Sequence, residues 1–284
     1  MRVLLVHNRY RSAEPSGENV VVDEEARLLE EHGCTVERVE ADSDSIAELS
    51  ALGRTALPLR VTWSRHGFRL VREAVTAFSP DIVHVHNTFP LLSPATLWAA
   101  RRSGAAVVQT LHNFRPLCAA GTLLRDGRPC RECVGSAPVA AVRHACYRGS
   151  RSASAAVATM IAAHRALGTW HRCVDRFLVP SRFVLDEYAA AGWPVDRMEV
   201  KHNTARDPLV RRDGPGRQFV CVARLSPEKG VDDLLRAWSH TFADGAQRLV
   251  IVGDGPDAPA LAARAGALAG VELRGRLPHA ETLA

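Results

Sequence analysis

The sequence lacks the features that mark several common classes of protein. Aromatic residues make up only 6% of its 284 positions, and no run of Lys or Arg is dense enough to form a basic stripe. Nucleic-acid binders need aromatic stacking platforms and continuous positive charge, so a nucleic-acid partner is not expected. The dinucleotide-binding pattern GxGxxG is missing too, and GDGP at 253–256 is no adequate substitute. A nicotinamide-dependent dehydrogenase is therefore not expected either.

Long apolar runs are also missing. The N-terminal stretch MRVLLVHNRY has only a few apolar residues before His7, too few for a signal peptide or a membrane span. We therefore expect a cytoplasmic protein. The formal charge of +5 and the pI near 9.0 fit anionic small molecules, and they also fit peripheral contact with the inner face of an anionic membrane.

What the sequence does contain is an alternation of strands and helices. Apolar runs that end in polar residues predict strands at 2–8, 34–40, 81–87, 105–113, 175–181 and 198–203, and helices are predicted at 18–33, 68–79, 93–104, 150–171 and 182–191. Gly33 is expected to end the first of these helices and Ser93 to cap the third. The series breaks into Pro, Gly and charge at 204–217, and it resumes with strands at 218–224, 248–255 and 271–275 and helices at 230–242 and 258–269.

This alternation predicts an α/β protein with two Rossmann-like domains, each built on a parallel sheet. The N-terminal domain is expected at 1–203, with an insertion at 113–149, and a linker follows at 204–217. A partial C-terminal domain is expected at 218–284.

Ligands bind parallel sheets beyond the carboxyl ends of the strands. Gly17 follows the first predicted strand, where a missing side chain lets a ligand approach the backbone. His86 and Asn87 follow another strand, and His86 could reach the mouth of the cleft. His112 suits a hydrogen bond to a substrate hydroxyl or an acid/base role, although a strand-end histidine is more often structural. We expect His84 to be packed inside, and we do not interpret it with His86 as a metal site because the pair is too close in the chain and lacks a third ligand nearby.

The stretch VARLSPEKG at 222–230 is the most informative in the second domain. It places Arg224 at a strand end and Lys229 at the start of a helix. Two cations and the amides of a helix N-terminus form a receptor for a diphosphate, whereas the alternative is an exposed basic loop. Gly253 and Asp254 follow the next strand and complete the predicted phosphate-binding set.

Several short motifs occur in an order that is more specific than any one of them. VLLVHN, DIVHVHN, TLHN, VPS, HNTARDP, VARLSPEKG and IVGDGP together resemble the GT-B-fold, retaining nucleotide-sugar glycosyltransferases of glycosyltransferase family 4. The resemblance covers nearly the whole chain. It assigns Arg224 and Lys229 to the donor diphosphate, Gly17 to the phosphates or the acceptor, and His112 to the donor sugar. His86 and Asn87 are expected on the acceptor side.

The resemblance implies transfer of a hexose from a nucleotide-diphosphate sugar to a glycan or lipid-linked acceptor, in polysaccharide biosynthesis. Preorganised cations would stabilise the leaving diphosphate, so no catalytic metal is expected. The family pattern continues into a Glu-x7-Glu motif, whereas this chain ends at Ala284 and Glu281 is not part of such a motif. We therefore expect an incomplete second domain. The alternative function is a non-catalytic protein that binds a nucleotide sugar or a partner without turnover.

Seven cysteines, an odd number without a secretory signal, predict reduced thiols or metal ligands. Cys118, Cys130, Cys133 and Cys146 have the spacing C-x11-C-x2-C-x12-C, which fits a structural zinc site. His144 is an alternative ligand, and packed thiols or a disulfide in an oxidising compartment are alternative states. The C-x-x-C pair sits in a polar turn, which disfavours a thioredoxin-like role. Four thiolate ligands leave no open position for water, so zinc would order a loop and take no part in the chemistry.

Overall fold

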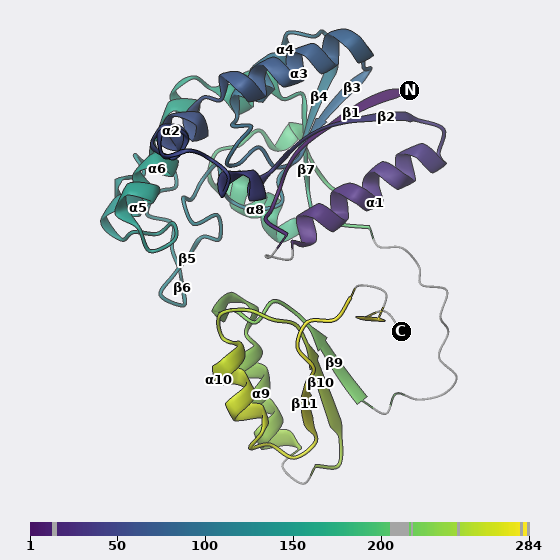
Figure 1. Ribbon diagram of the computed structural model, residues 1–284, viewed down its shortest axis with the longest axis vertical. Coiled ribbons are helices and arrows are strands. Elements are labelled where there is room, and N and C mark those ends of the chain that lie inside the picture. The colour runs from purple at the N-terminus through teal and green to yellow at the C-terminus, as the bar shows by residue number, and fades with distance from the viewer. Residues whose placement is uncertain (13–15, 205–215, 217, 243–244, 279–280, 283–284) are drawn as a thin grey trace. The chain divides into compact units, whose positions relative to one another are not determined.

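The computed structural model describes residues 1–12, 16–204, 216, 218–242, 245–278 and 281–282 (Figure 1). The chain divides into two compact units, 1–205 and 206–284. The linker predicted at 204–217 lies almost wholly outside the described residues. Each unit has its own sheet and its own hydrophobic core.

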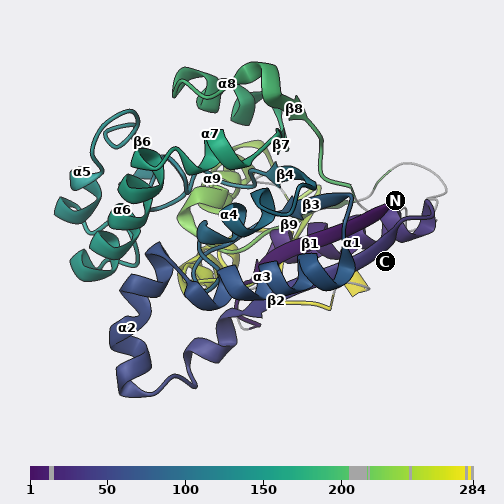
Figure 2. The ribbon, with the colours of Figure 1, turned by 90° about the horizontal axis from the view of Figure 1, so that it is seen from above.

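The first unit is built on a six-stranded sheet in which all neighbouring strands are parallel (Figures 1 and 2). The strand order is β2-β1-β3-β4-β7-β8. The strands are β1 (Arg2–Arg9), β2 (Thr35–Asp42), β3 (Ile82–Val85), β4 (Ala106–Thr110), β7 (Arg176–Val179) and β8 (Met198–Val200). Each lies within or overlaps a predicted strand, and the predicted α/β class is confirmed.

Helices cover both faces of this sheet, which is why the central strand β1 is apolar on both sides, whereas the edge strand β2 is largely polar and exposed. Figure 1 shows α1 on one side of the strands and α3 and α4 on the other. Leu4 of β1 packs in the core that contains Val71 of α3, whereas the next residue, Leu5, packs with Ala26 of α1. The helices are α1 (Gly17–Glu31), α2 (Ala51–Thr62), α3 (Arg65–Phe78), α4 (Ala95–Arg101), α6 (Arg151–Ala166), α7 (Thr169–Cys173) and α8 (Arg182–Ala190), and short 3-10 turns lie at Ser43–Ile46 and Val195–Arg197.

Three local features differ from the sequence-based expectation. The helix predicted at 150–171 is two helices, because Gly168 adopts a left-handed conformation (φ +61°) between them. The N-cap position of α4 is Pro94 and not the predicted Ser93, although the Ser93 hydroxyl accepts from the N–H groups of both Ser64 and Ala95. Helix α2 was not predicted, and it contains Pro58 in its interior. Gly33 follows the end of α1 with φ +80°, as predicted.

The Cys-rich insertion predicted at 113–149 contains little regular structure. A two-stranded antiparallel hairpin, β5 (Leu124–Arg125) and β6 (Arg128–Pro129), turns through Asp126 and Gly127, both with positive φ. The short helix α5 (Val139–Arg143) follows. A small core joins the insertion to α6, with Cys133 and Ile161 among its buried members. The insertion is therefore packed onto the first unit.

The second unit is a three-stranded parallel sheet of order β11-β10-β9. Its elements are β9 (Gln218–Val222), the 3-10 turn Pro227–Lys229, α9 (Val231–Thr241), β10 (Arg248–Val252), α10 (Ala258–Ala265) and β11 (Val271–Leu273). Both helices pack on the sheet through one core, in which Leu235 and Leu261 meet Ile251. The edge strand β9 keeps three apolar side chains about half exposed: Phe219 (51%), Val220 (54%) and Val222 (57%).

Two glycines allow the loops after β9 and β10 to pack backbone against backbone. Gly253 has φ +151°, and a Cβ there would lie 1.8 Å from the carbonyl oxygen of Ala223. A Cβ at Gly255 would lie 2.3 Å from the carbonyl oxygen of Leu225, whose N–H donates to Asp254 O at 2.9 Å. The close approach of the two loops therefore requires glycine at both positions.

We expect Gly253→Ala to destabilise the second unit by more than about 2 kcal/mol, because the added methyl group overlaps a carbonyl oxygen. Gly266→Ala is the matched control, since Gly266 ends α10 with φ −63° and a Cβ there meets no atom closer than 3.4 Å. Hydrogen exchange of peptides from β9 and β10 measures the difference. Equal protection of these peptides in the two variants would contradict the packing role of Gly253.

Candidate functional site

The candidate site lies where the strand order of the first sheet reverses. β2 and β3 flank β1, so the carboxyl ends of β1 and β3 open a crevice. The backbone N–H of Asn8 donates to Asn87 O at 2.6 Å, and Asn87 Nδ2 donates to Asn8 O at 2.9 Å. Asn8 Oδ1 also accepts from the N–H of Leu91 at 2.7 Å. These bonds join the two strand ends and fix the loop that follows β3.

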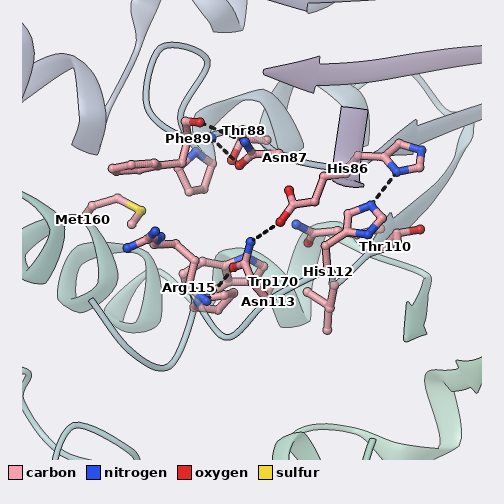
Figure 3. A pocket seen from close by; sticks show the side chains of 15 residues that line it. His86, Asn87, Thr88, Phe89, Thr110, His112, Asn113, Arg115, Met160 and Trp170 are labelled. Atoms are coloured by element: carbon pink, nitrogen blue, oxygen red, sulfur yellow. Dashed lines mark hydrogen bonds between the residues drawn. The ribbon is translucent and has the colours of Figure 1, made fainter. Parts of the chain in front are cut away.

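A pocket opens in this crevice, formed by the loops after β3 and β4 and the first turn of α1 (Figure 3). It brings together three predicted residues, His86, Asn87 and His112. The side-chain amide of Asn87 is used by the backbone, because Nδ2 donates to Phe89 O and Oδ1 accepts from Phe89 N. Other lining residues are Glu18, Thr88, Pro94, Gln109, Thr110, Leu111, Asn113, Arg115, Pro116, Met160 and Trp170.

His86 and His112 are in direct contact in the pocket. Nδ1 of His86 lies 2.9 Å from Nε2 of His112, and the rings stack with their centroids 5.2 Å apart. Burial lowers the pKa of His86 well below its usual range, and burial together with the neighbouring His7 and His84 lowers the pKa of His112 to about 4. Both rings are therefore neutral at neutral pH. Nε2 of His86 is buried and has no hydrogen-bond partner in the described structure.

A buried ionic network lies behind these two rings. Glu25 Oε1 is 2.8 Å from His84 Nδ1, and Glu25 Oε2 accepts from Lys201 Nζ at 2.8 Å. Burial alone would raise the pKa of Glu25, but the bonds from His84 and Lys201 outweigh it and hold the pKa at about 2. The His84 ring lies 4.2 Å from the His86 ring, centroid to centroid. The network therefore packs against the His86 ring through His84 and stabilises the position of the histidine pair.

The expectation that His84 and His86 have no third ligand nearby was wrong. Glu25 places a carboxylate oxygen beside them, and this is the only group of three His, Cys, Asp or Glu donors within 4.8 Å of one another in the described residues. Both nitrogens of His84 are nevertheless engaged, with Glu25 and with Thr110 Oγ1 at 2.8 Å. We interpret the group as a hydrogen-bonded support for the pocket and not as a metal site.

Glu18 is a pocket residue that the sequence-based reasoning missed. Its Oε1 accepts from Asn113 Nδ2 at 2.8 Å and from the Tyr10 hydroxyl at 3.2 Å, while its Oε2 is buried without a hydrogen-bond partner in the described structure. Burial raises the pKa of Glu18, against the lowering effect of Asn113 and Tyr10. The available signal was its place in the first turn of the helix that follows the first strand. A carboxyl group with a free oxygen at a pocket can bind a ligand hydroxyl.

Arg115 forms the opposite wall of the pocket. Its guanidinium lies over the rings of Phe89 and Tyr147, 4.7 and 5.2 Å from their centroids, and Nη1 donates to Ala119 O. Figure 3 shows the Arg115 side chain extending alongside Phe89. Stacking between two rings holds the cation in place and leaves positive charge at the pocket.

Gly17, the remaining predicted residue of the first unit, begins α1. Ser16 caps this helix, since its Oγ accepts from the N–H of Glu18 at 3.2 Å. No atom lies within 4 Å of the position that a Cβ on Gly17 would occupy. The space beside this backbone is therefore open, whereas Gly17 itself does not line the pocket.

The predicted donor-binding residues lie in the second unit. Arg224 and Lys229 are both exposed, and they flank Glu228. Burial raises the pKa of Glu228, but the hydroxyl of Ser226 and the two nearby cations have the larger effect, so the pKa of Glu228 is lowered overall. Asp254 Oδ1 accepts from the N–H of Gly255 at 2.7 Å, which stabilises the loop after β10. Two unpaired cations thus stand on the loop after β9, in the described part of this unit.

Comparison with known families gives two matches. The family described as Glycosyltransferase Family 4 matches residues 15–205, and the family described as Glycosyl transferases group 1 matches residues 216–284. A GDP-mannose-dependent alpha-mannosyltransferase of Mycobacterium tuberculosis is 32% identical over 213 residues, which are 72% of this chain. The chain spans only 45% of that relative's length.

Solved structures with the same fold are more distant in sequence. The Anabaena protein Alr3699/HepE in complex with UDP is 17% identical with a TM-score of 0.54, over 100% of this chain and 71% of its own. The lipopolysaccharide outer core galactosyltransferase WaaB is 16% identical with a TM-score of 0.50, over 98% of this chain and 68% of its own. These likenesses confirm the predicted GT-B type of fold. No helix in the described residues has the length and hydropathy needed to span a bilayer.

The low pKa of Glu25 predicts a pH-dependent contribution to stability. Because the pKa is about 2 in the folded chain and 4.5 ordinarily, the contribution is complete above pH 4.5 and is lost as the pH falls towards 2. We expect Glu25→Gln to lower the free energy of unfolding at pH 7 by about 3 kcal/mol, with a smaller difference from wild type at pH 3. Urea unfolding at both pH values measures this.

Glu30→Gln is the control for this experiment, because Glu30 is an exposed residue of the same helix. We expect it to change the free energy of unfolding by less than about 0.5 kcal/mol at either pH. A difference between Glu25→Gln and wild type that stays constant from pH 7 to pH 3 would show that the ion pairs of Glu25 are not its source.

Proposed function

Because the chain belongs to glycosyltransferase family 4, we propose that it is a hexosyltransferase, which moves a hexose from a nucleotide-diphosphate sugar to a glycan or lipid-linked acceptor. The observation that carries this proposal is the pair of unsatisfied buried atoms on residues that line the pocket, Glu18 Oε2 and His86 Nε2. Sugar hydroxyls both donate and accept hydrogen bonds, so a sugar ring would satisfy both atoms. Polysaccharide biosynthesis is the setting that this activity suggests.

Arg224 and Lys229 would bind the donor diphosphate. A planar guanidinium binds two phosphate oxygens at once, and an ammonium adds a compact charge. The mycobacterial relative is named for GDP-mannose and the Anabaena structure contains UDP, which supports a nucleotide-diphosphate donor and leaves the base open. Gly17 would let the ligand approach the start of α1, beside which the space is open.

The proposed reaction breaks the bond between the anomeric carbon and the diphosphate oxygen, and it forms a bond from that carbon to an acceptor oxygen. The electron pair of the broken bond stays on the diphosphate, where the cations Arg224 and Lys229 would stabilise the charge without a catalytic metal. The acceptor proton would pass to the leaving phosphate, with retention of configuration. His112, neutral at pH 7, would hold a hydroxyl of the donor sugar in the pocket.

Nucleotide binding tests the donor site. We expect Arg224→Ala to weaken the binding of UDP or GDP, measured by calorimetry, about 10- to 100-fold, because a charge-assisted hydrogen bond contributes about 1.5–3 kcal/mol. Arg248→Ala is the matched control, since Arg248 begins β10 at the amino end of the strand and pairs with Glu272. Equal affinity of the Arg224→Ala variant and wild type would remove Arg224 from the donor site.

Turnover separates a transferase from a non-catalytic binding protein. Release of nucleoside diphosphate from GDP-mannose and UDP-glucose is measured for wild type and His112→Ala, with glycan and lipid-linked acceptors present. Release by wild type that falls at least about tenfold in the variant supports the transferase. Binding of the nucleotide without release would favour the non-catalytic protein.

Lysine occurs at only two positions of the chain, Lys201 and Lys229, which makes amine labelling unusually specific. Lys229 is exposed, whereas the ammonium of Lys201 is held by Glu25. We expect UDP or GDP to slow acetylation of Lys229 about fivefold or more, as measured by mass spectrometry, because a bound phosphate covers the ammonium. Acetylation of Lys201 serves as the internal control. Full labelling of Lys229 at a saturating nucleotide concentration would place the nucleotide elsewhere.

A further inference from the structure

Four of the seven cysteines converge on one pocket of the insertion. Cys118, Cys130, Cys133 and Cys146 all line it, although they are spread over 29 positions of the chain. None of them forms a disulfide. The other three lie elsewhere: Cys34 packs beside α1, Cys173 lies in the main core, and Cys221 belongs to the second unit. The convergence is therefore confined to the cysteines of the insertion.

The surroundings of these thiols are mostly apolar, with one ion pair between Arg125 and Glu132. Apolar lining comes from Ala119, Leu123, Ala140 and Ala141, and the charged lining residues are Arg125 and Glu132. Burial and the neighbouring sulfurs raise the pKa of the thiols of Cys133 and Cys146. A divalent metal that binds thiolate would deprotonate the thiols on coordination.

We propose that Cys118, Cys130, Cys133 and Cys146 bind one structural Zn²⁺ ion. Tetrahedral zinc accepts four thiolates at about 2.3 Å, and the C-x-x-C hook of Cys130 and Cys133 is the usual start of such a site. The four sulfurs share a pocket but, within the described residues, no three of them lie within 4.8 Å of one another. Zinc binding would draw them together and so tighten the insertion.

Positive charge is available for the complex, which carries a net charge of −2. It comes from Arg165, whose Nη1 donates to the carbonyl oxygen of Cys133 at 2.9 Å, whereas Arg125 lines the pocket but is paired with Glu132 at 2.7 Å. Cationic partners near a tetrathiolate zinc site orient the ligands and offset their charge. His144 is not among the lining residues, and its Nε2 lies 3.7 Å from Glu132 Oε2. The structure therefore favours four cysteines over three cysteines and this histidine.

The proposed ion would hold the wall of the candidate site. The N–H of Cys118 donates to Phe114 O at 2.7 Å, and Arg115 donates to Ala119 O, one residue beyond Cys118. Arg165 bonds to the carbonyl oxygens of Pro116 and Leu117, in addition to that of Cys133. A metal at the cysteines would thus fix the loop that begins after β4. Four closed ligands leave no position for substrate, so the role is structural.

Metal content is the direct test, and it does not depend on turnover. Full-length protein is purified without chelator and without a metal-affinity step, and metals are measured by inductively coupled plasma mass spectrometry. We expect about one zinc per chain, a loss of thermal stability when a strong chelator removes it, and recovery when zinc is returned. Zinc below about a tenth per chain, together with no uptake from micromolar zinc, would overturn the proposal.

Cobalt substitution identifies the ligands. Co²⁺ in a tetrathiolate site gives strong sulfur-to-cobalt charge-transfer and tetrahedral ligand-field absorption, which we expect in wild type and in the control Cys34→Ser. Cys133→Ser is expected to lose the four-sulfur spectrum and at least about tenfold in affinity for the metal. If this variant does not fold, the metal content and the cobalt spectrum of wild type still show whether the chain binds a metal through four sulfurs. Iron with sulfide, or an intact mass that shows a disulfide, would overturn the zinc assignment.

Discussion

The hydrogen bonds between Asn8 and Asn87 are the constraint on which the candidate site depends. They join the ends of β1 and β3 at the point where the strand order reverses, and Asn8 Nδ2 also donates to Ser43 Oγ beyond β2. Three strand ends are thereby held by two side chains. Because a parallel sheet gathers its strand ends at one edge, fixing the loop after β3 fixes His86 in the position from which it contacts His112 after β4.

The two units supply different chemistry. The pocket of the first unit is lined by buried polar groups, among them the neutral rings of His86 and His112, and by one half-buried cation, Arg115, which stacks on aromatic rings. Such a lining suits the hydroxyl groups of a sugar. The second unit presents exposed cations at a strand end, which suits a diphosphate. Burial explains the division, because a buried cation without a partner is costly whereas an exposed one is not. The single lysine of the first unit, Lys201, is accordingly paired with Glu25.

Strand positions and strand-end residues could be predicted from the sequence, because a buried parallel strand is a local apolar run with a polar end. This reasoning located His86, Asn87 and His112, which the structure brings into one pocket. It missed Glu18 and Glu25, because their partners are distant: Asn113 is 95 positions from Glu18, and Lys201 is 176 positions from Glu25. Helix α2 was missed because Pro58 interrupts its pattern, while packing against α6 stabilises it. Contacts between residues that are far apart in the chain leave no pattern in the local sequence.

Glu25 has a consequence for how this sequence can vary. Its carboxylate serves His84 in the middle of the sheet and Lys201 at the end of β8, where the chain leaves the first unit. A substitution of His84 or Lys201 removes one partner of the Glu25 carboxylate and so changes its interaction with the other partner. The effects of changes at these three positions are therefore not independent. Among related chains, we expect these positions to vary together or not at all, and a graft of one of them alone into a homologue to fail. The sheet thus imposes an evolutionary coupling between its central strand and its last one.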